Sequence, residues 1–288
     1  MDATADGENK SPSLGTPSTS TAISMTDLST DDALLQFQKL VDEDLPKQRF
    51  TVCRVDGKGE LGRDIISIYK KPDLKLRAVP KVRFEEEDAV GSGPVREFLV
   101  LAMDVVDEGI PSCSGQSKPL IFFEGQPDHR LPVHDQSLRQ TGAFKALGRI
   151  IGHSILHGGP GLYGLSPAVK HVLTIGSESI EPPPIVPEDI VDIDLRQIII
   201  HHLNVLSIKE TQSPVTAEEK EELIQYLLEA GIDPDTFPTE RELVIQELMM
   251  FHVIHKRRLQ LNDIAKGLNS FNLTPCTLNY TYYTQCIH

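Results

Sequence analysis

Hydrophobic residues recur at helical spacing through the middle of the chain, most clearly over residues 144–159. The apolar side chains there form a single stripe of Phe144, Leu147, Ile151, Ile155 and Leu156. Gly148 and Gly152 lie four residues apart within this stripe, although glycine costs about 1 kcal/mol relative to alanine inside a helix. We therefore expect the backbone of a second helix to approach here. The pattern predicts a buried central helix that ends at Gly158 and Gly159.

Before this helix, the pattern alternates between strand and helix spacing. It predicts strands at Phe50–Val55 and Lys81–Glu85, with a break at Gly57–Gly62. Helices are expected over residues 64–70 and 95–106. A further strand at Pro119–Phe123 returns over Gln126–His134. These elements predict an α+β region.

The second half of the chain is predicted to be helical. A short helix over residues 168–174 is followed by one that begins at Pro187 and turns Leu195 and Ile199 inward. Thr216–Glu219 is a capping box that opens a helix ending at Gly231, and Thr239–Glu242 is a second one. The second capping box is expected to open one long helix to Lys266. The fold class is therefore α+β, predominantly helical.

The N-terminal segment has a different composition from the rest. Residues 1–30 contain twelve serines and threonines and few large apolar side chains, which predicts a disordered arm. A short amphipathic helix follows, with Leu34, Phe37, Leu40 and Val41 on one face. It is either a docking peptide or a lid on the domain, and we favour the lid. The arm and its helix are assigned to residues 1–48.

Charge and cysteine content exclude several classes of protein. The net charge of −14 and the pI near 5.1 disfavour nucleic acid and anionic membrane surfaces as partners. No apolar stretch is long enough to span a membrane, and no signal sequence is evident. The four cysteines have no CxxC spacing, which is typical of reduced thiols in a cytoplasmic or nuclear protein.

The motifs of common enzymes are missing. His153 and His157 are four residues apart and His252 and His255 three, but no HExxH motif is present. His201 and His202 are adjacent and are expected to face apart. We therefore expect structural histidines, with no metal and no cofactor. Gly91–Pro94 is interpreted as a tight turn, because the acidic residues 85–88 before it would repel a phosphate. There is no GxSxG hydrolase motif.

Five segments in order resemble the HECT family of ubiquitin ligases. KVRFEEEDAVGSGPVREFL (81–99) resembles its strand and helix signature KVxFxGEEGVDxGGVxREFF, and FKALGRIIGHSILHG (144–158) resembles FxFIGRVLGxAIYHG. IVPEDIVDIDLR (185–196) and PVTAEEKEELIQYLLE (214–229) are similar to later segments of that family, and residues 252–271 match the position of its long helix. The resemblance is greatest to the short, divergent HECT proteins.

The resemblance implies that residues 49–272 are a HECT N-terminal lobe. In the family this lobe receives the ubiquitin-loaded E2 enzyme, and a hinged C-terminal lobe carries a cysteine that takes ubiquitin as a thioester. Ubiquitin, an E2 and protein substrates are the implied partners. The subdomain that docks the E2 is expected to be shortened here to His201–Ser213.

We expect the catalytic C-terminal lobe to be missing, with an unrelated tail in its place at residues 273–288. Cys276 is the one candidate nucleophile in it, while Cys53 and Cys113 match no family cysteine. No lysine, arginine or histidine neighbours Cys276 to lower its pKa, so we expect this chain alone to form no thioester. Two functions stay open, a HECT-type ubiquitin-protein transferase and a non-catalytic HECT-like module that binds or regulates.

Overall fold

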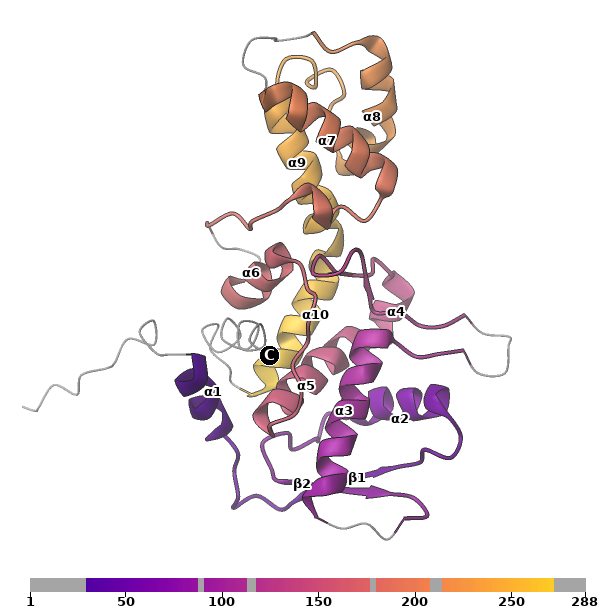
Figure 1. Cartoon of the computed structure of the whole chain (residues 1–288), viewed down its shortest axis with the longest axis vertical. Helices are drawn as coiled ribbons and strands as arrows, with labels where there is room; N and C mark the ends of the chain where they lie inside the picture. The colour runs from indigo at the N-terminus through magenta and orange to yellow at the C-terminus, as the bar shows by residue number, and fades with distance from the viewer. Residues whose placement is uncertain (1–29, 88–90, 113–117, 177–179, 208–213, 272–288) are drawn as a thin grey trace, which may run out of the picture.

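The computed structural model describes residues 30–87, 91–112, 118–176, 180–207 and 214–271, which form an elongated molecule (Figure 1). A broad body occupies one end and a narrower helical unit the other. The body contains α1 (Thr30–Gln38), α2 (Lys58–Lys70), α3 (Ser92–Glu108), α4 (Gln136–Gln140), α5 (Ala143–Leu156), α6 (Pro167–Ile175) and α10 (Arg258–Leu268). The helical unit at the other end, here called the apical unit, contains α7 (Ile193–Ser207), α8 (Ala217–Ala230) and most of α9 (Arg241–Val253). The predicted fold class, α+β and predominantly helical, is confirmed.

Two short strands begin the body. β1 (Gln48–Val52) and β2 (Pro80–Phe84) pair in parallel, with Phe50 opposite Val82. Every second side chain is buried, as the alternation predicted. Because a parallel pair needs a crossover connection, α2 lies between the two strands in sequence.

β1 ends before Gly57–Gly62, where the break in the strand was predicted, but the helix expected from residue 64 already begins at Lys58. Gly57 takes a φ of 91° at the helix start, a conformation that glycine adopts without strain. Gly62 is buried inside the helix, where an added Cβ would lie 3.1 Å from a side-chain carbon of Ile110. These glycines therefore start the helix and allow close packing, instead of interrupting the chain.

The second strand pair is shorter than predicted. β3 (Phe123–Glu124) pairs antiparallel with β4 (Leu131–Pro132), which lies inside the predicted return segment. The rest of the predicted strand is irregular, except that Leu120 forms an isolated bridge with Ile110 at the end of α3. α4 follows, with Asp135 accepting the first-turn N–H of Leu138 at 2.8 Å.

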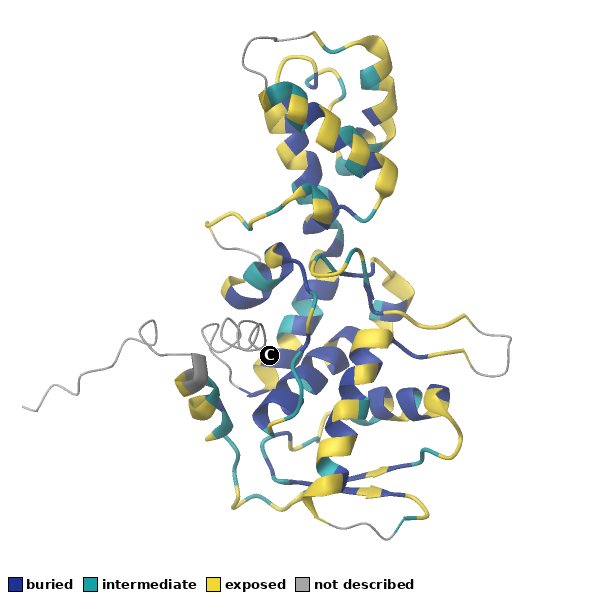
Figure 2. Ribbon diagram, viewed as in Figure 1, coloured by how far each residue is buried: buried dark blue, intermediate teal, exposed yellow. Residues whose placement is uncertain are grey.

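α5 is the central helix of the body, as its apolar stripe predicted (Figure 2). All of its residues except Lys145 and Arg149 are buried. α2, α3 and α10 pack against it, and α10 makes the most extensive contact. An added Cβ on Gly148 would lie 2.9 Å from the Cα of Gly267, and one on Gly152 would overlap the ring of Phe271, with Cδ2 at 2.7 Å and Cε2 closer still. The predicted close approach of a second helix is confirmed.

α1 covers one end of this core. Phe37 is buried, and its ring packs edge-to-face on Phe271 with the centroids 6.4 Å apart. This is the arrangement that the lid interpretation predicted. Residues 1–29 and 273–288 lie outside the described part of the chain, so the domain boundaries at residues 48 and 272 stay predictions.

The connection into the apical unit differs from the prediction. Instead of one helix from Pro187, a single 3₁₀ turn, η2 (Pro187–Asp189), precedes α7. Asp189 is fully buried. Its carboxylate accepts a hydrogen bond from the N–H of Val186 at 3.0 Å and another from Nδ1 of His129 at 2.8 Å. These bonds hold the turn apart from α7. Asp192 then accepts the N–H of Leu195 at 3.0 Å, and α7 begins at the next residue, Ile193.

The capping box at α8 is confirmed. Thr216 accepts the N–H of Glu219 at 3.2 Å, Glu219 accepts the N–H of Thr216 at 2.7 Å, and the helix ends at Gly231 with a φ of 75°. The capping box predicted at Thr239 is wrong. Its hydroxyl instead donates to the carbonyl of Thr236, and α9 begins after Glu240 with no side-chain cap.

The predicted single helix to Lys266 is also wrong, because a 3₁₀ turn, η3 (His255–Arg257), separates α9 from α10. Arg257 is buried at this break, which we call the α9–α10 joint. Its guanidinium donates to the carbonyl of Pro132 at 2.9 Å, to the carboxylate of Glu124 at 2.6 Å and to the carbonyl of His252. The joint is thereby fastened to the β3–β4 hairpin.

Candidate functional site

The apical unit has its own small core. Helices α7, α8 and α9 pack together around a set of buried apolar side chains contributed by all three helices and by the α8–α9 connection: Leu195, Ile199, Leu223, Leu227, Phe237, Val244, Ile245 and Leu248. The unit stands clear of the body except through η2 and the α9–α10 joint (Figure 1). It contains residues 201–207 of the stretch 201–213 to which the sequence assigned the shortened docking subdomain. Residues 208–213 of the predicted stretch 201–213 lie outside the described part of the chain.

Large aliphatic side chains remain exposed on this unit. Ile193 and Ile200 lie seven residues apart and therefore on one face of α7. Ile224 and Leu228 lie four residues apart on one face of α8, and Leu228 is 63% exposed. We call these four side chains the apical aliphatic set. Apolar side chains that repeat along one exposed helix face are typical of a surface that binds another protein.

The apical unit also carries negative charge. Glu218, Glu221 and Glu222 are exposed on α8, and Asp192 and Asp194 are exposed at the start of α7. Lys220 is paired with Asp235, so this cation is already compensated. The combination of aliphatic and acidic side chains favours a partner with an apolar and basic surface.

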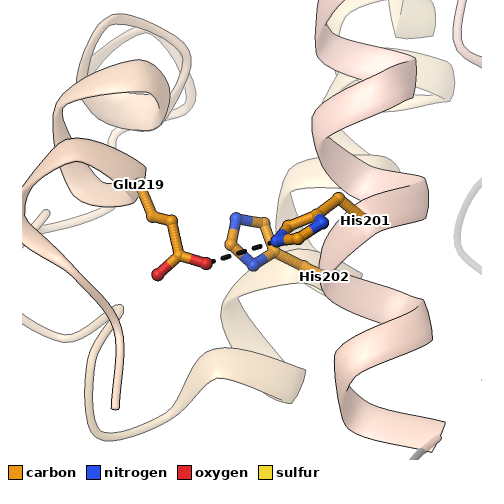
Figure 3. A group of neighbouring side chains, drawn as sticks. All are labelled: His201, His202 and Glu219. Atoms are coloured by element: carbon orange, nitrogen blue, oxygen red, sulfur yellow. Dashed lines mark hydrogen bonds and ion pairs between the residues drawn. The ribbon is translucent and has the colours of Figure 1, made fainter. Parts of the chain in front are cut away.

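Three potential metal-ligating side chains meet between α7 and the first turn of α8 (Figure 3). They are His201, His202 and Glu219. One ligand atom from each lies within 4.8 Å of the other two, and the two imidazole centroids are 5.3 Å apart. Nε2 of His201 lies 3.3 Å from a carboxylate oxygen of Glu219. The expectation that these histidines face apart is therefore wrong.

The three side chains differ in burial and charge. His201 is exposed, whereas His202 is 1% exposed and packs edge-on against Phe237. Burial lowers the pKa of His202 to about 4, and the positive charge of Arg241 acts in the same direction. The backbone N–H of Thr216 lowers the pKa of Glu219, so its carboxylate is ionised at neutral pH. Nδ1 of His202 is buried and has no hydrogen-bond partner.

The remaining histidine pairs behave as structural residues. Nδ1 of His153 is 2.7 Å from the hydroxyl of Tyr69 within the body core, and Nε2 of His157 is 3.0 Å from the carbonyl of Leu76. Burial lowers the pKa of both histidines. His252 is buried beside Tyr226, while His255 is exposed at the α9–α10 joint. Neither pair belongs to the three-residue cluster.

Cys276, the candidate nucleophile predicted from the sequence, falls outside the part of the chain that the structure describes. Cys113 also lies outside the described ranges. Cys53 has a free, half-buried thiol directly after β1. Gly91 starts α3 with a φ of 117°, as expected of a tight turn. Among the described ranges, no helix combines the length and the apolar character that crossing a bilayer requires.

Sequence reasoning missed the approach of Glu219 to His201 and His202. The glutamate was recognised only as the last residue of a capping box, although that box fixes its carboxylate at the start of α8. The adjacent histidines and this box are seventeen residues apart, counted from His202 to Glu219. All three ligand types were visible in the sequence, but only the packing of α7 on α8 brings the two histidines next to the glutamate.

Comparison with known proteins gives distant relatives. No family model matches the chain. It is 24% identical over 192 residues to the G2/M phase-specific E3 ubiquitin-protein ligase of Macaca fascicularis and equally to that of Homo sapiens, covering 65% of this chain. The Gallus gallus protein of the same name is 28% identical over 153 residues. The chain spans about a quarter of the length of the mammalian relatives, 24% in each case. It is thus distantly related to E3 ubiquitin-protein ligases.

Proposed function

We propose that this chain is a HECT-type N-terminal lobe of an E3 ubiquitin-protein ligase, and that its apical unit docks a ubiquitin-conjugating E2 enzyme. The distant relatives bear the name of E3 ubiquitin-protein ligases, which implies an E2 and ubiquitin as general partners. The five ordered segments that resemble HECT sequences extend from β2 to η4 (Asn269–Phe271). Protein substrates complete the set of partners.

The observation that carries the proposal is the apical aliphatic set on a unit that projects from the body. The resemblance implies E2 docking at residues 201–213, and Ile193, Ile224 and Leu228 are exposed on α7 and α8, the two helices that this stretch connects. Exposing such side chains to water costs about 25 cal/mol for every Å² that a partner could bury. The acidic residues beside them would speed association with a basic E2 surface.

The proposal is tested by binding the full chain to a panel of purified E2 enzymes, measured by biolayer interferometry. Leu228→Lys should weaken E2 binding by about ten-fold or more, because it places a charge in the apolar contact. A lysine in the last turn of α8 suits the negative end of the helix, so the fold should be preserved. The matched control is Leu259→Lys on α10, where the leucine is 50% exposed on the body.

Equal loss of binding in both variants would show that the effect is not specific to the apical unit. Binding that is unchanged in Leu228→Lys, or no binding to any E2, contradicts the proposed docking site. Circular dichroism and thermal unfolding of each variant establish that the comparison is made between folded proteins.

A non-catalytic binding or regulatory module is the second candidate function. The observation that favours it is the sequence around Cys276, which has no lysine or arginine from residue 272 to 288 to stabilise a thiolate. Incubation with ubiquitin-charged E2, followed by a non-reducing gel, separates the two functions. A reductant-sensitive adduct that Cys276→Ala abolishes supports transfer by this chain, and E2 binding without an adduct supports the module.

A further inference from the structure

We infer that His201, His202 and Glu219 form a binding site for a divalent transition-metal ion of the Zn²⁺ class, which fastens α7 to the start of α8. This site is independent of E2 docking and of ubiquitin transfer. It rests on the convergence of three ligand atoms within 4.8 Å of one another (Figure 3).

The ligand set selects the class of metal. Two imidazole nitrogens and one carboxylate oxygen are ligands that Zn²⁺ accepts, at bond lengths of about 2.0–2.2 Å. Ca²⁺ and Mg²⁺ prefer sites made of oxygen atoms. Three protein ligands leave the fourth position of a tetrahedron for water, and the exposed side of the cluster at His201 gives water access.

The buried imidazole supplies an independent reason to place a ligand here. His202 is 1% exposed, and its Nδ1 has no hydrogen-bond partner among the described residues. A buried polar atom without a partner loses the free energy of its hydration and gains no hydrogen bond in return. Coordination of a metal by this imidazole would remove that penalty.

The carboxylate is already oriented by the backbone. One oxygen of Glu219 accepts the N–H of Thr216 at 2.7 Å, which leaves the other oxygen directed at His201 at 3.3 Å. A hydrogen bond from the backbone to a ligating carboxylate is the kind of support that metal sites ordinarily have. That 3.3 Å is about the separation of two ligand atoms in a tetrahedral zinc site, so the approach that remains is that of the His202 imidazole, whose ligand atom lies within 4.8 Å of the other two.

The charges around the cluster are compatible with a cation. Glu218 is exposed one residue before Glu219, and the cation of Lys220 is paired with Asp235. Arg241 is the positive side chain that acts on His202 from α9. Metal bound here would link two helices that are separated by the connection from residue 208 to 216, and so stabilise the folded apical unit, because the unfolded chain does not hold the three ligands together.

The test uses the full chain, stripped with chelator and kept in a metal-free phosphine reductant, and titrated with ZnCl₂ by calorimetry at neutral pH. We expect one Zn²⁺ per chain and a thermal midpoint that rises with Zn²⁺ concentration. His201→Ala and Glu219→Gln should each weaken binding by about ten-fold or more. Glutamine keeps an oxygen that can accept the N–H of Thr216, so α8 retains its cap.

His255→Ala is the matched control, because His255 is an exposed histidine outside the cluster and its loss should leave the affinity unchanged. A further variant, with all four cysteines changed to serine, should bind Zn²⁺ with the affinity of the original chain. The inference is overturned by affinity that is equal in His201→Ala and the original chain, by binding that needs the cysteines, or by no binding up to about 1 mM Zn²⁺. Co²⁺ substitution gives a second readout, since a tetrahedral site shows intense visible absorption that His201→Ala should remove.

Discussion

Gly148 of α5 and Gly267 of α10 face each other where the two helices cross. An added Cβ on Gly148 would lie 2.9 Å from the Cα of Gly267, and an added Cβ on Gly267 would lie 2.8 Å from the Cα of Gly148. Both neighbours are backbone atoms, which cannot rotate away as a side chain can. The two glycines therefore set the separation of the most extensive helix contact in the molecule.

Gly148→Ala should destabilise the protein by about 2–4 kcal/mol, because the added methyl group forces α5 and α10 apart. Urea unfolding measured by circular dichroism gives the change. Gly93→Ala is the control: an added Cβ there has no atom within 4 Å, and alanine is the better helix former. Stability of Gly148→Ala equal to that of the control would show that the crossing tolerates a side chain.

Tyr69→Phe should cost about 1–2 kcal/mol of stability. The substitution removes the hydroxyl 2.7 Å from Nδ1 of His153 and leaves a fully buried imidazole with neither nitrogen paired, because Nε2 already lacks a partner. Tyr226→Phe is the control, since its hydroxyl makes only a 3.4 Å contact with Asp192 at the surface. Thermal unfolding of the two variants should separate them clearly, and equal midpoints would contradict the expected role of the Tyr69 hydroxyl.

Stability should fall when the solution is acidified from pH 7.5 to 5.5. Burial lowers the pKa of His252 to about 4 in the folded protein, while the unfolded value is about 6.5. Above pH 6.5 the histidine is neutral in both states, and below it the unfolded chain takes up a proton that the folded chain does not. His252 should account for a loss of about 1 kcal/mol at pH 5.5.

Burial acts in the same direction on His153 and His157, which add to this acid sensitivity. Comparing urea unfolding at the two pH values for the original chain and for His252→Gln isolates the contribution of His252. The difference between the two pH values should shrink in the variant, whatever its absolute stability. An undiminished difference would mean that His252 titrates normally.

Arg257→Met should destabilise the protein by about 2–4 kcal/mol. Methionine keeps most of the volume, but the carbonyls of Pro132 and His252 and the carboxylate of Glu124 lose their donor. Lys145→Met, at an exposed lysine of α5, should change stability by less than about 0.5 kcal/mol. A small effect of both variants, measured by urea unfolding, would show that the α9–α10 joint does not depend on this arginine.

Local patterns predicted the elements whose causes are local. The glycines and apolar stripe of α5, the alternation in β1 and β2, and the capping box of α8 all appear in the structure as expected. The break between α9 and α10 did not follow from the pattern, because the apolar residues stop at Ile254 but resume at Leu259 and Leu261. Its stabilisation comes from Arg257 and the carbonyl of Pro132, 125 residues away.

The candidate site was predictable only in part. The sequence predicted a docking region at residues 201–213, between α7 and α8, but it gave no reason to combine His201 and His202 with Glu219. Adjacent residues on a helix point about 100° apart, and only the position of α8 lets both imidazoles approach one carboxylate. The expected inactivity of Cys276 stays a prediction.

The α9–α10 joint is a fixed point about which the apical unit can rotate relative to the body. Arg257 fastens the joint to the β3–β4 hairpin, and α9 extends from it for thirteen residues, roughly 20 Å at 1.5 Å per residue. A rotation of α9 by about 10° about the α9–α10 joint would therefore move the far end of the helix by roughly 3–4 Å, while the body core stays in place. A protein bound to α7 or α8 would be repositioned by that amount through changes at η3 and η2, the two connections to the body.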